Sequence, residues 1–204
     1  VGCVVTYEDS FTTLNDKYFV GRALDNRIGG FIIAEVARLL HKNKNKLPYG
    51  LYITNSVQEE VGLHGAKMIV ETIKPNVAII TDVCHDTSTP MINKIKQGDL
   101  KCGNGPVLSY GPSVQNNLLK VIINTAKENK IPFQRLAASR ATGTDTDAFA
   151  FANGGVASAL ISLPLRYMHT TVESAHIDDV QHVIELIYNC LLNLKDQQDF
   201  RYLK

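Results

Sequence analysis

The stretch that decides the fold runs from residue 49 to residue 83 and reads YGLYITNSVQEEVGLHGAKMIVETIKPNVAIITDV. Residues 49–58 have the β-branched and aromatic composition of a strand, and the apolar spacing over 62–74 is that of a helix. Residues 75–83 form a run that is apolar almost throughout, which is typical of a strand covered on both faces of a sheet. A strand, a helix and a strand in succession predict an α/β fold.

The same alternation continues on both sides of this stretch. We expect further strands over 105–111, 132–138 and 155–163, and helices over 25–44, 112–130, 144–152 and 177–194. Short extended segments over 2–7 and 18–21 precede the first helix. The pattern predicts an α/β three-layer sandwich, with a mostly parallel mixed sheet between two layers of helices.

The first and last helices carry broad apolar stripes. The stripe of the first helix consists of Ile28, Phe31, Ile32, Ala34, Val36, Leu39 and Leu40, and that of the last consists of Val180, Val183, Ile184, Ile187, Leu191 and Leu194. An Asp-Asn pair at 25–26 precedes the first stripe in the position of a helix cap, and basic residues follow the stripe. The sequence therefore predicts a buried helix with Asp25 at its N-terminus.

Composition narrows the class of partner. The chain has 204 residues, of which 45% are apolar and 20% charged, so it is long enough for one large domain with a full core. Its 21 basic and 20 acidic residues are spread along the chain and give a net charge of +1. This balance gives no electrostatic footprint for nucleic acid or an anionic membrane, and no apolar run is long enough to cross a bilayer. A peptide or small-molecule partner is favoured.

The cysteine spacing and the missing signal peptide indicate the cellular compartment, and the first residues of the sequence indicate a fragment. Cys3, Cys84, Cys102 and Cys190 lie far apart, which argues against a zinc-thiolate site and against a redox dithiol. Reduced, buried thiols and the lack of a signal peptide lead us to expect a cytoplasmic protein. The sequence opens at VGCVVTYEDS without an initiator Met. We therefore expect a fragment of a longer protein.

Five residues of metal-binding type stand where predicted elements end. They are Asp25 at a helix start, Glu59 and Glu60 after one strand, Asp82 after another, and His169 after a third. Function in α/β sheets gathers at strand ends, so these side chains can converge on one pocket. Three carboxylates and an imidazole suit Zn²⁺, Mn²⁺ or Co²⁺.

The adjacent glutamates suggest a division of labour. A hydrolytic metal site needs ligands that hold the ion and a separate carboxylate that takes a proton from the attacking water. One glutamate would bind and its neighbour would be the base. Each residue alone also has a plainer explanation, because a Glu pair is usually a solvated turn, an Asp at a helix start is usually a cap, and a lone His is usually a satisfied side chain.

Five motifs in order carry a resemblance to a known family. They are ALDNRIGG (23–30), QEEVGLHGA (58–66), TDVCHD (81–86), GTDTDAFAF (143–151) with a following GG, and PLRYMHTTVE (164–173). Together they resemble the dinuclear metalloaminopeptidases that include the tetrahedral (TET) aminopeptidases, glutamyl and deblocking aminopeptidases, and proteins labelled endoglucanase or cellulase M. The resemblance runs from about Val20 to the end of the chain and implies a zinc-exopeptidase-like fold.

The resemblance also implies roles for the five residues. Asp25 would bridge two divalent ions, with Zn²⁺ or Co²⁺ expected. Glu60 and His169 would complete one metal site, and Asp82 would bind the other ion. Glu59 would be the general base. A cis peptide bond between Asp25 and Asn26 is implied as well.

The sequence departs from the family in its N-terminal part. Family members carry a β-rich dimerisation domain before the LDNR motif and bring a further metal-binding histidine from an N-terminal segment, whereas no histidine precedes His41 here. We expect residues 1–20 to be a remnant of the dimerisation domain and residues 21–204 to be the catalytic domain. The second metal site would lack one ligand. Either the chain omits part of an ordinary enzyme, or it is a truncated product that binds at most one ion well.

The motifs and the residue types together predict one function, and two alternatives stay open. We expect a metal-dependent aminopeptidase that removes N-terminal residues from short peptides, in a full-length form that assembles into homo-oligomers from dimers to dodecamers. One alternative is a deacylase-type metallohydrolase, acting for example on an N-acyl amino acid. Another is a non-catalytic assembly subunit or an incomplete fragment.

Overall fold

The structure is a computed structural model that describes residues 2–6 and 10–202. Its helices are α1 (Leu24–Lys42), α2 (His64–Ile73), α3 (Lys94–Gln97), α4 (Asn116–Glu128), α5 (Thr146–Ala150) and α6 (Ile177–Asn193). Its strands are β1 (Thr12–Leu14), β2 (Tyr18–Gly21), β3 (Val77–His85), β4 (Val107–Tyr110), β5 (Gln134–Ala137), β6 (Ala157–Arg166) and β7 (Glu173–His176). The predicted helices, the extended segment over 18–21 and four of the five other predicted strands are present, with ends that differ by a few residues.

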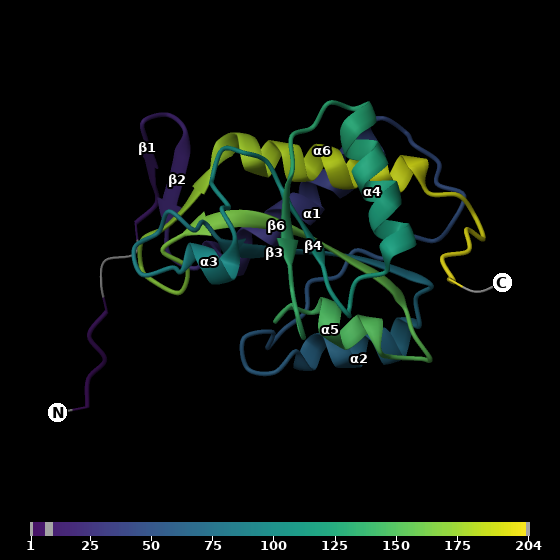
Figure 1. Cartoon of the computed structure of the whole chain (residues 1–204), viewed down its shortest axis with the longest axis horizontal. Coiled ribbons are helices and arrows are strands. Elements are labelled where there is room, and N and C mark those ends of the chain that lie inside the picture. Colours follow the sequence, from purple (N-terminus) through teal and green to yellow (C-terminus); the bar gives the residue numbers. More distant parts are fainter. Residues whose placement is uncertain (1, 7–9, 203–204) are drawn as a thin grey trace.

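The elements form three layers, as the sequence predicts. Figure 1 shows α1, α4 and α6 on one side of the sheet strands, and α2 and α5 on the other. The larger apolar core lies between the first group of helices and the sheet. A smaller cluster around Ala66, Val70 and Phe149 lies between the other two helices, α2 and α5, and the opposite face of the sheet. The residues of the α6 stripe are all buried, whereas Phe31 of the predicted α1 stripe is more than half exposed.

The described strands form a seven-stranded mixed sheet. β3 pairs with β6 and β4 pairs with β5 in parallel, while the pairs β1–β2, β2–β7, β4–β6 and β6–β7 are antiparallel. Parallel pairing is therefore less prevalent than expected. The reason lies partly in β7, which the sequence did not predict: it follows β6 after a link too short for the crossover that a parallel pair needs.

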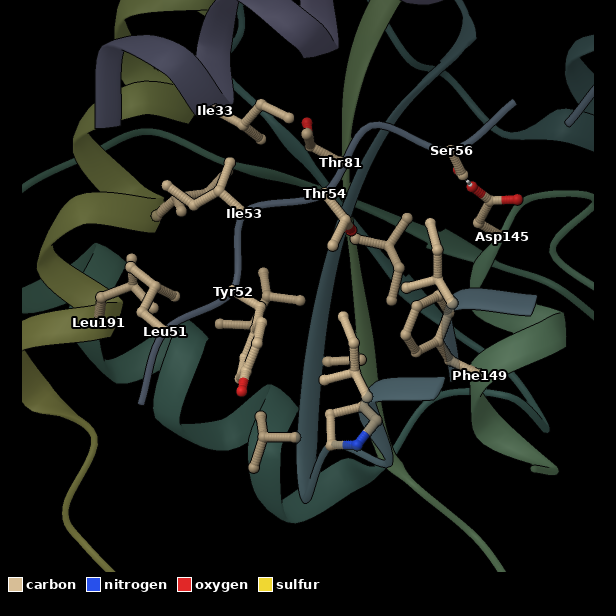
Figure 2. Close-up of a pocket in the computed structure, with 18 of the residues that line it drawn as sticks. Ile33, Leu51, Tyr52, Ile53, Thr54, Ser56, Thr81, Asp145, Phe149 and Leu191 are labelled. Carbon is tan, nitrogen blue, oxygen red and sulfur yellow. Dashed lines mark hydrogen bonds between the residues drawn. The ribbon is translucent and has the colours of Figure 1, made fainter. Parts of the chain in front are cut away.

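The predicted strand over 49–58 is absent. This segment has no ladder partner among the described residues, and β3 pairs there with β6 alone. A cavity of about 1080 Å³ separates the segment from the free edge of β3. Figure 2 shows Leu51, Tyr52 and Ile53 projecting from the segment beside β3. The prediction was wrong because β propensity describes how a residue packs on a sheet, and a strand forms only against a partner backbone.

The N-terminal region contributes to the same sheet. Residues 2–6 form no strand, and residue 7 of that predicted segment lies outside the described residues. β2, by contrast, pairs with β7 along its whole length. The boundary between residues 20 and 21 stays a prediction. Among the described residues, no helix combines the length and the apolar character that crossing a membrane requires.

Candidate metal and active site

The first turn of α1 is shaped to leave the Asp25 carboxylate free. Asp25 and Asn26 have non-helical backbone angles, and the peptide bond between them is cis, as the family resemblance implies. Asn26 Oδ1 accepts a hydrogen bond from the Gly29 amide at 2.9 Å, so Asn26 caps the regular helix and Asp25 does not. A Cβ on Gly29 would lie 2.4 Å from Asn26 Oδ1, which explains the glycine in this motif.

Asn26 also fixes Asp82. Its Nδ2 donates to Asp82 Oδ1 and to the Thr81 carbonyl oxygen, both at 3.1 Å, and the Val83 amide donates to Asp82 Oδ1 at 2.8 Å. Asp82 stands within β3 rather than after it, because the strand continues to His85. Burial raises the pKa of Asp82 to about 8, against the opposing effect of the Val83 N–H.

Glu59 and Glu60 lie in the turn that leads into α2. The carbonyl oxygen of Glu59 accepts hydrogen bonds from the Gly62 and Leu63 amides, which closes this turn. Upstream, the Ser56 hydroxyl donates to Asp145 Oδ2, which ties the turn to the start of α5 (Figure 2). Burial, followed by the negative charge of Asp145, raises the pKa of Glu59 to about 7.

The structure brings His169 together with Asp25 and Glu60. His169 follows β6 in a left-handed conformation with φ of 63°. Its Nε2 lies 3.1 Å from Asp25 Oδ2 and 3.4 Å from Glu60 Oε2. One ligand atom from each of these three residues lies within 4.8 Å of the others. Two carboxylates and an imidazole at this spacing fit a divalent ion of the zinc type.

Asp82 and Glu59 stand beside this group without joining it. Among the described residues, the group of close ligand atoms contains only Asp25, Glu60 and His169. Asp82 nevertheless interacts electrostatically with Asp25 and Glu59. Burial, followed by the charge of Glu60, raises the pKa of Asp25 to about 6. The five predicted residues therefore form one acidic region, and three of them form a group that could hold a metal ion.

Two supporting carboxylates were missed by the sequence reasoning. Glu173 is 2% exposed and accepts hydrogen bonds from the backbone amides of Asp25 and His169. Asp147 accepts from the Ser113 hydroxyl and from the Thr142 and Gly143 amides, and so shapes the loop that carries Asp145. Both residues belong to the quoted motifs. Glu173 lies outside the predicted strands, so its place in the PLRYMHTTVE motif, four residues after His169, is the signal that could have identified it.

Comparisons with known proteins find relatives that are named as aminopeptidases. The family described as M42 glutamyl aminopeptidase matches residues 1–186. Lysyl aminopeptidase of Pyrococcus furiosus is 35% identical over 195 residues, covering 96% of this chain and 54% of that protein. Glutamyl aminopeptidase of Lactococcus lactis is 30% identical over 179 residues, covering 86% and 48%. The chain thus spans about half the length of the curated relatives it matches.

Solved structures match equally well. A TET aminopeptidase from a marine sediment Thaumarchaeota archaeon superposes with a TM-score of 0.85 at 30% identity, covering 91% of this chain and 52% of that one. TET1 peptidase of Pyrococcus horikoshii superposes with a TM-score of 0.77 at 28% identity, covering 92% and 54%. The family match covers most of the chain, and the folds agree. The chain belongs to the M42 glutamyl aminopeptidase family.

Proposed function

We propose that this chain forms the catalytic core of a metal-dependent aminopeptidase that removes N-terminal residues from short peptides. The observation that carries the proposal is the cluster of Asp25, Glu60 and His169, three potential ligands that lie far apart in the sequence and converge within 4.8 Å. Relatives named for lysyl and glutamyl aminopeptidase activity support the reaction class.

Asp25, Glu60 and His169 would hold one divalent ion, and Asp25 with Asp82 would hold a second. Among the described residues, we assign two candidate ligands to the second ion and three to the first, so we expect weaker binding at the second position. Divalent ions at these positions would polarise the scissile carbonyl and lower the pKa of the attacking water. Zn²⁺ and Co²⁺ fit the mixture of imidazole and carboxylate ligands.

Glu59 is the proposed general base. It lies outside the ligand cluster and next to a member of it, and its pKa of about 7 in the metal-free protein lies near neutral pH. A base with a pKa near the working pH can take a proton from water and return it to the departing amine. Asp145, tied to Ser56, lies close enough to Glu59 to raise this pKa.

Assembly is proposed on the evidence of relatives. TET1 peptidase of Pyrococcus horikoshii is described as assembling into a tetrahedron or a large octahedral shell. We propose that the intact protein likewise forms homo-oligomers. Sedimentation velocity of the purified protein tests this, and a monomer at micromolar concentration would contradict it.

The function is tested by measuring the release of free amino acids from a panel of peptides. The panel pairs each free-amine peptide with its N-acetylated form, with and without added Zn²⁺ or Co²⁺ and with a chelator. We expect cleavage of the free-amine peptides only, abolished by the chelator and restored by metal. Cleavage of the acetylated forms would favour a deacylase, and chelator-resistant cleavage would contradict metal dependence.

A further inference from the structure

We propose that Glu173 is a positioning residue that holds two of the metal ligands, Asp25 and His169, at a fixed separation through their backbones. The inference rests on the proposed function, because it assigns Glu173 a purpose in the metal site. It concerns a residue that supplies no ligand atom to the cluster, although its sequence position is close to that of His169.

The geometry is that of a two-armed clamp. Glu173 Oε2 accepts a hydrogen bond from the Asp25 amide at 3.0 Å, and Oε1 accepts one from the His169 amide at 2.7 Å. Each carboxylate oxygen therefore holds one ligand residue. Asp25 is 148 residues from Glu173 in the sequence, so the clamp joins two segments that the chain itself does not hold together.

The sheet places the clamp between these segments. Glu173 begins β7 and stands opposite Gly21 in the ladder between β2 and β7. Asp25 follows Gly21 by four residues, and His169 precedes Glu173 by four residues. The carboxylate thus lies at the point where the chain leaves β2 for α1 and where it enters β7.

His169 needs such support from its backbone. Its side chain is 63% exposed, so packing restrains it little. Its backbone adopts the left-handed conformation, which is uncommon for residues other than glycine. A strong hydrogen bond to a carboxylate at this amide restricts the position from which the imidazole projects.

The charge on Glu173 has a cost that the clamp explains. A buried carboxylate beside another carboxylate is unfavourable, and Glu173 is one of the residues that raise the pKa of Asp25. A glutamine would avoid this repulsion, but its amide has one acceptor oxygen and one donor nitrogen. Only the carboxylate form can accept from both amides without placing two donors face to face.

Asp179 provides a matched control. It is fully buried and accepts hydrogen bonds from the Gly103 and Gly105 amides at 2.6 and 2.7 Å, so it has the same chemistry as Glu173. Its amide partners belong to the loop before β4, and none of them is a candidate ligand. Loss of either carboxylate should weaken the fold, but only loss of Glu173 should disturb the metal site.

The test compares E173Q with D179N in the intact protein. Amide hydrogen exchange of the metal-free protein should show faster exchange at Asp25 or His169 in E173Q and unchanged exchange at both in D179N. Calorimetric titration with Zn²⁺ should show a roughly 10–100-fold loss of affinity in E173Q, as for other residues that orient metal ligands. D179N should retain the wild-type affinity at a similar loss of thermal stability.

Equal Zn²⁺ affinity in E173Q and D179N, or unchanged exchange at both Asp25 and His169, would overturn the proposal. If E173Q does not fold, E173D keeps the charge with a shorter reach and should show the same loss of affinity. If neither variant folds, Glu173 supports the fold as a whole and the proposal is wrong. A wild-type protein that binds no Zn²⁺ contradicts the proposed function instead, while the exchange experiment still tests the clamp.

Discussion

Two groups of carboxylates in this molecule have pKa values that are shifted in opposite directions. Asp86 accepts hydrogen bonds from the Ser88 amide and hydroxyl and from the Cys102 amide, at 2.5 to 2.9 Å. Burial acts to raise the pKa of Asp86, but these hydrogen bonds outweigh it and lower the pKa below its ordinary value. At the candidate metal site, burial outweighs the opposing hydrogen bond from Val83 and raises the pKa of Asp82 to about 8.

The difference separates carboxylates that stabilise the fold through hydrogen bonds from carboxylates that we propose bind metal ions. Asp147, like Asp86, keeps its pKa below the ordinary value because the hydrogen bonds from Ser113, Thr142 and Gly143 outweigh the effect of burial. Asp25, Glu59 and Asp82 lie close enough to repel one another in the metal-free protein. Side chains that destabilise the empty protein in this way are characteristic of functional sites.

The largest expected effect is on turnover. Glu59→Gln removes the proposed base while keeping its size, so we expect kcat to fall by about 10²–10⁴-fold with folding and metal content preserved. Steady-state kinetics with a metal analysis of the same sample measure this. A variant with near-native turnover would exclude Glu59 as the base and would place it with the purely structural carboxylates.

A carboxylate of the structural group should affect stability instead. Asp147→Ala leaves the Ser113 hydroxyl and the Thr142 and Gly143 amides without their acceptor. Because Ser113 is buried, Thr142 is half-buried and Gly143 is exposed, we expect the free energy of unfolding to fall by about 1–3 kcal/mol. Denaturant titration measures it. Asp99→Ala is the control, since Asp99 is exposed and should leave the free energy of unfolding nearly unchanged. Equal losses in the free energy of unfolding for the two variants would contradict the structural role of Asp147.

The metal-free protein should have an unusual pH dependence of stability. The folded-state pKa of Asp82, about 8, exceeds the unfolded value of about 3.9, so the folded state binds more protons between these values. Stability should therefore fall as pH rises from about 5 to 8. Saturating Zn²⁺ should reverse the trend, because metal binding requires deprotonated ligands. Urea titrations across this pH range, with and without Zn²⁺, measure the free energy of unfolding. A free energy of unfolding that rises with pH in the metal-free protein would contradict this prediction.

A gain in stability is expected when the charge of Asp82 is removed. Asp82→Asn removes the buried charge but keeps the Oδ1 that accepts from Asn26 and Val83. We expect the metal-free variant to be more stable than the wild type at pH 8, by up to about 5 kcal/mol, because each unit of the pKa shift is worth about 1.4 kcal/mol. Thermal unfolding of the two metal-free proteins measures this difference. A loss of stability would place Asp82 with the structural group.

The sequence predicts the parts of the fold that local pattern determines. Helical periodicity identifies α1, α4 and α6, and the mostly apolar run over 75–83 identifies β3. The segment over 49–58 has the composition of a strand, but pairing depends on a neighbouring backbone that local pattern does not reveal. β7 is missed because three of its four residues, ESAH, are polar although all four are buried.

The candidate site follows the same division. Residue type and position at element ends select Asp25, Glu59, Glu60, Asp82 and His169, all of which lie in one acidic region of the structure. Their supports are less visible, because Glu173 and Asp147 act on backbone amides that any residue can provide. A long-range backbone contact leaves little trace in a single sequence.

The most direct test of the account is calorimetric titration of the metal-free protein with Zn²⁺, beside Asp25→Asn. Asp25 belongs to the three-residue cluster and is the proposed link between the two metal sites. We predict at least one tightly bound ion per chain in the wild type and loss of that binding in the variant. An Asp25→Asn protein that binds Zn²⁺ as tightly as the wild type, or a wild type that binds none, would contradict the account.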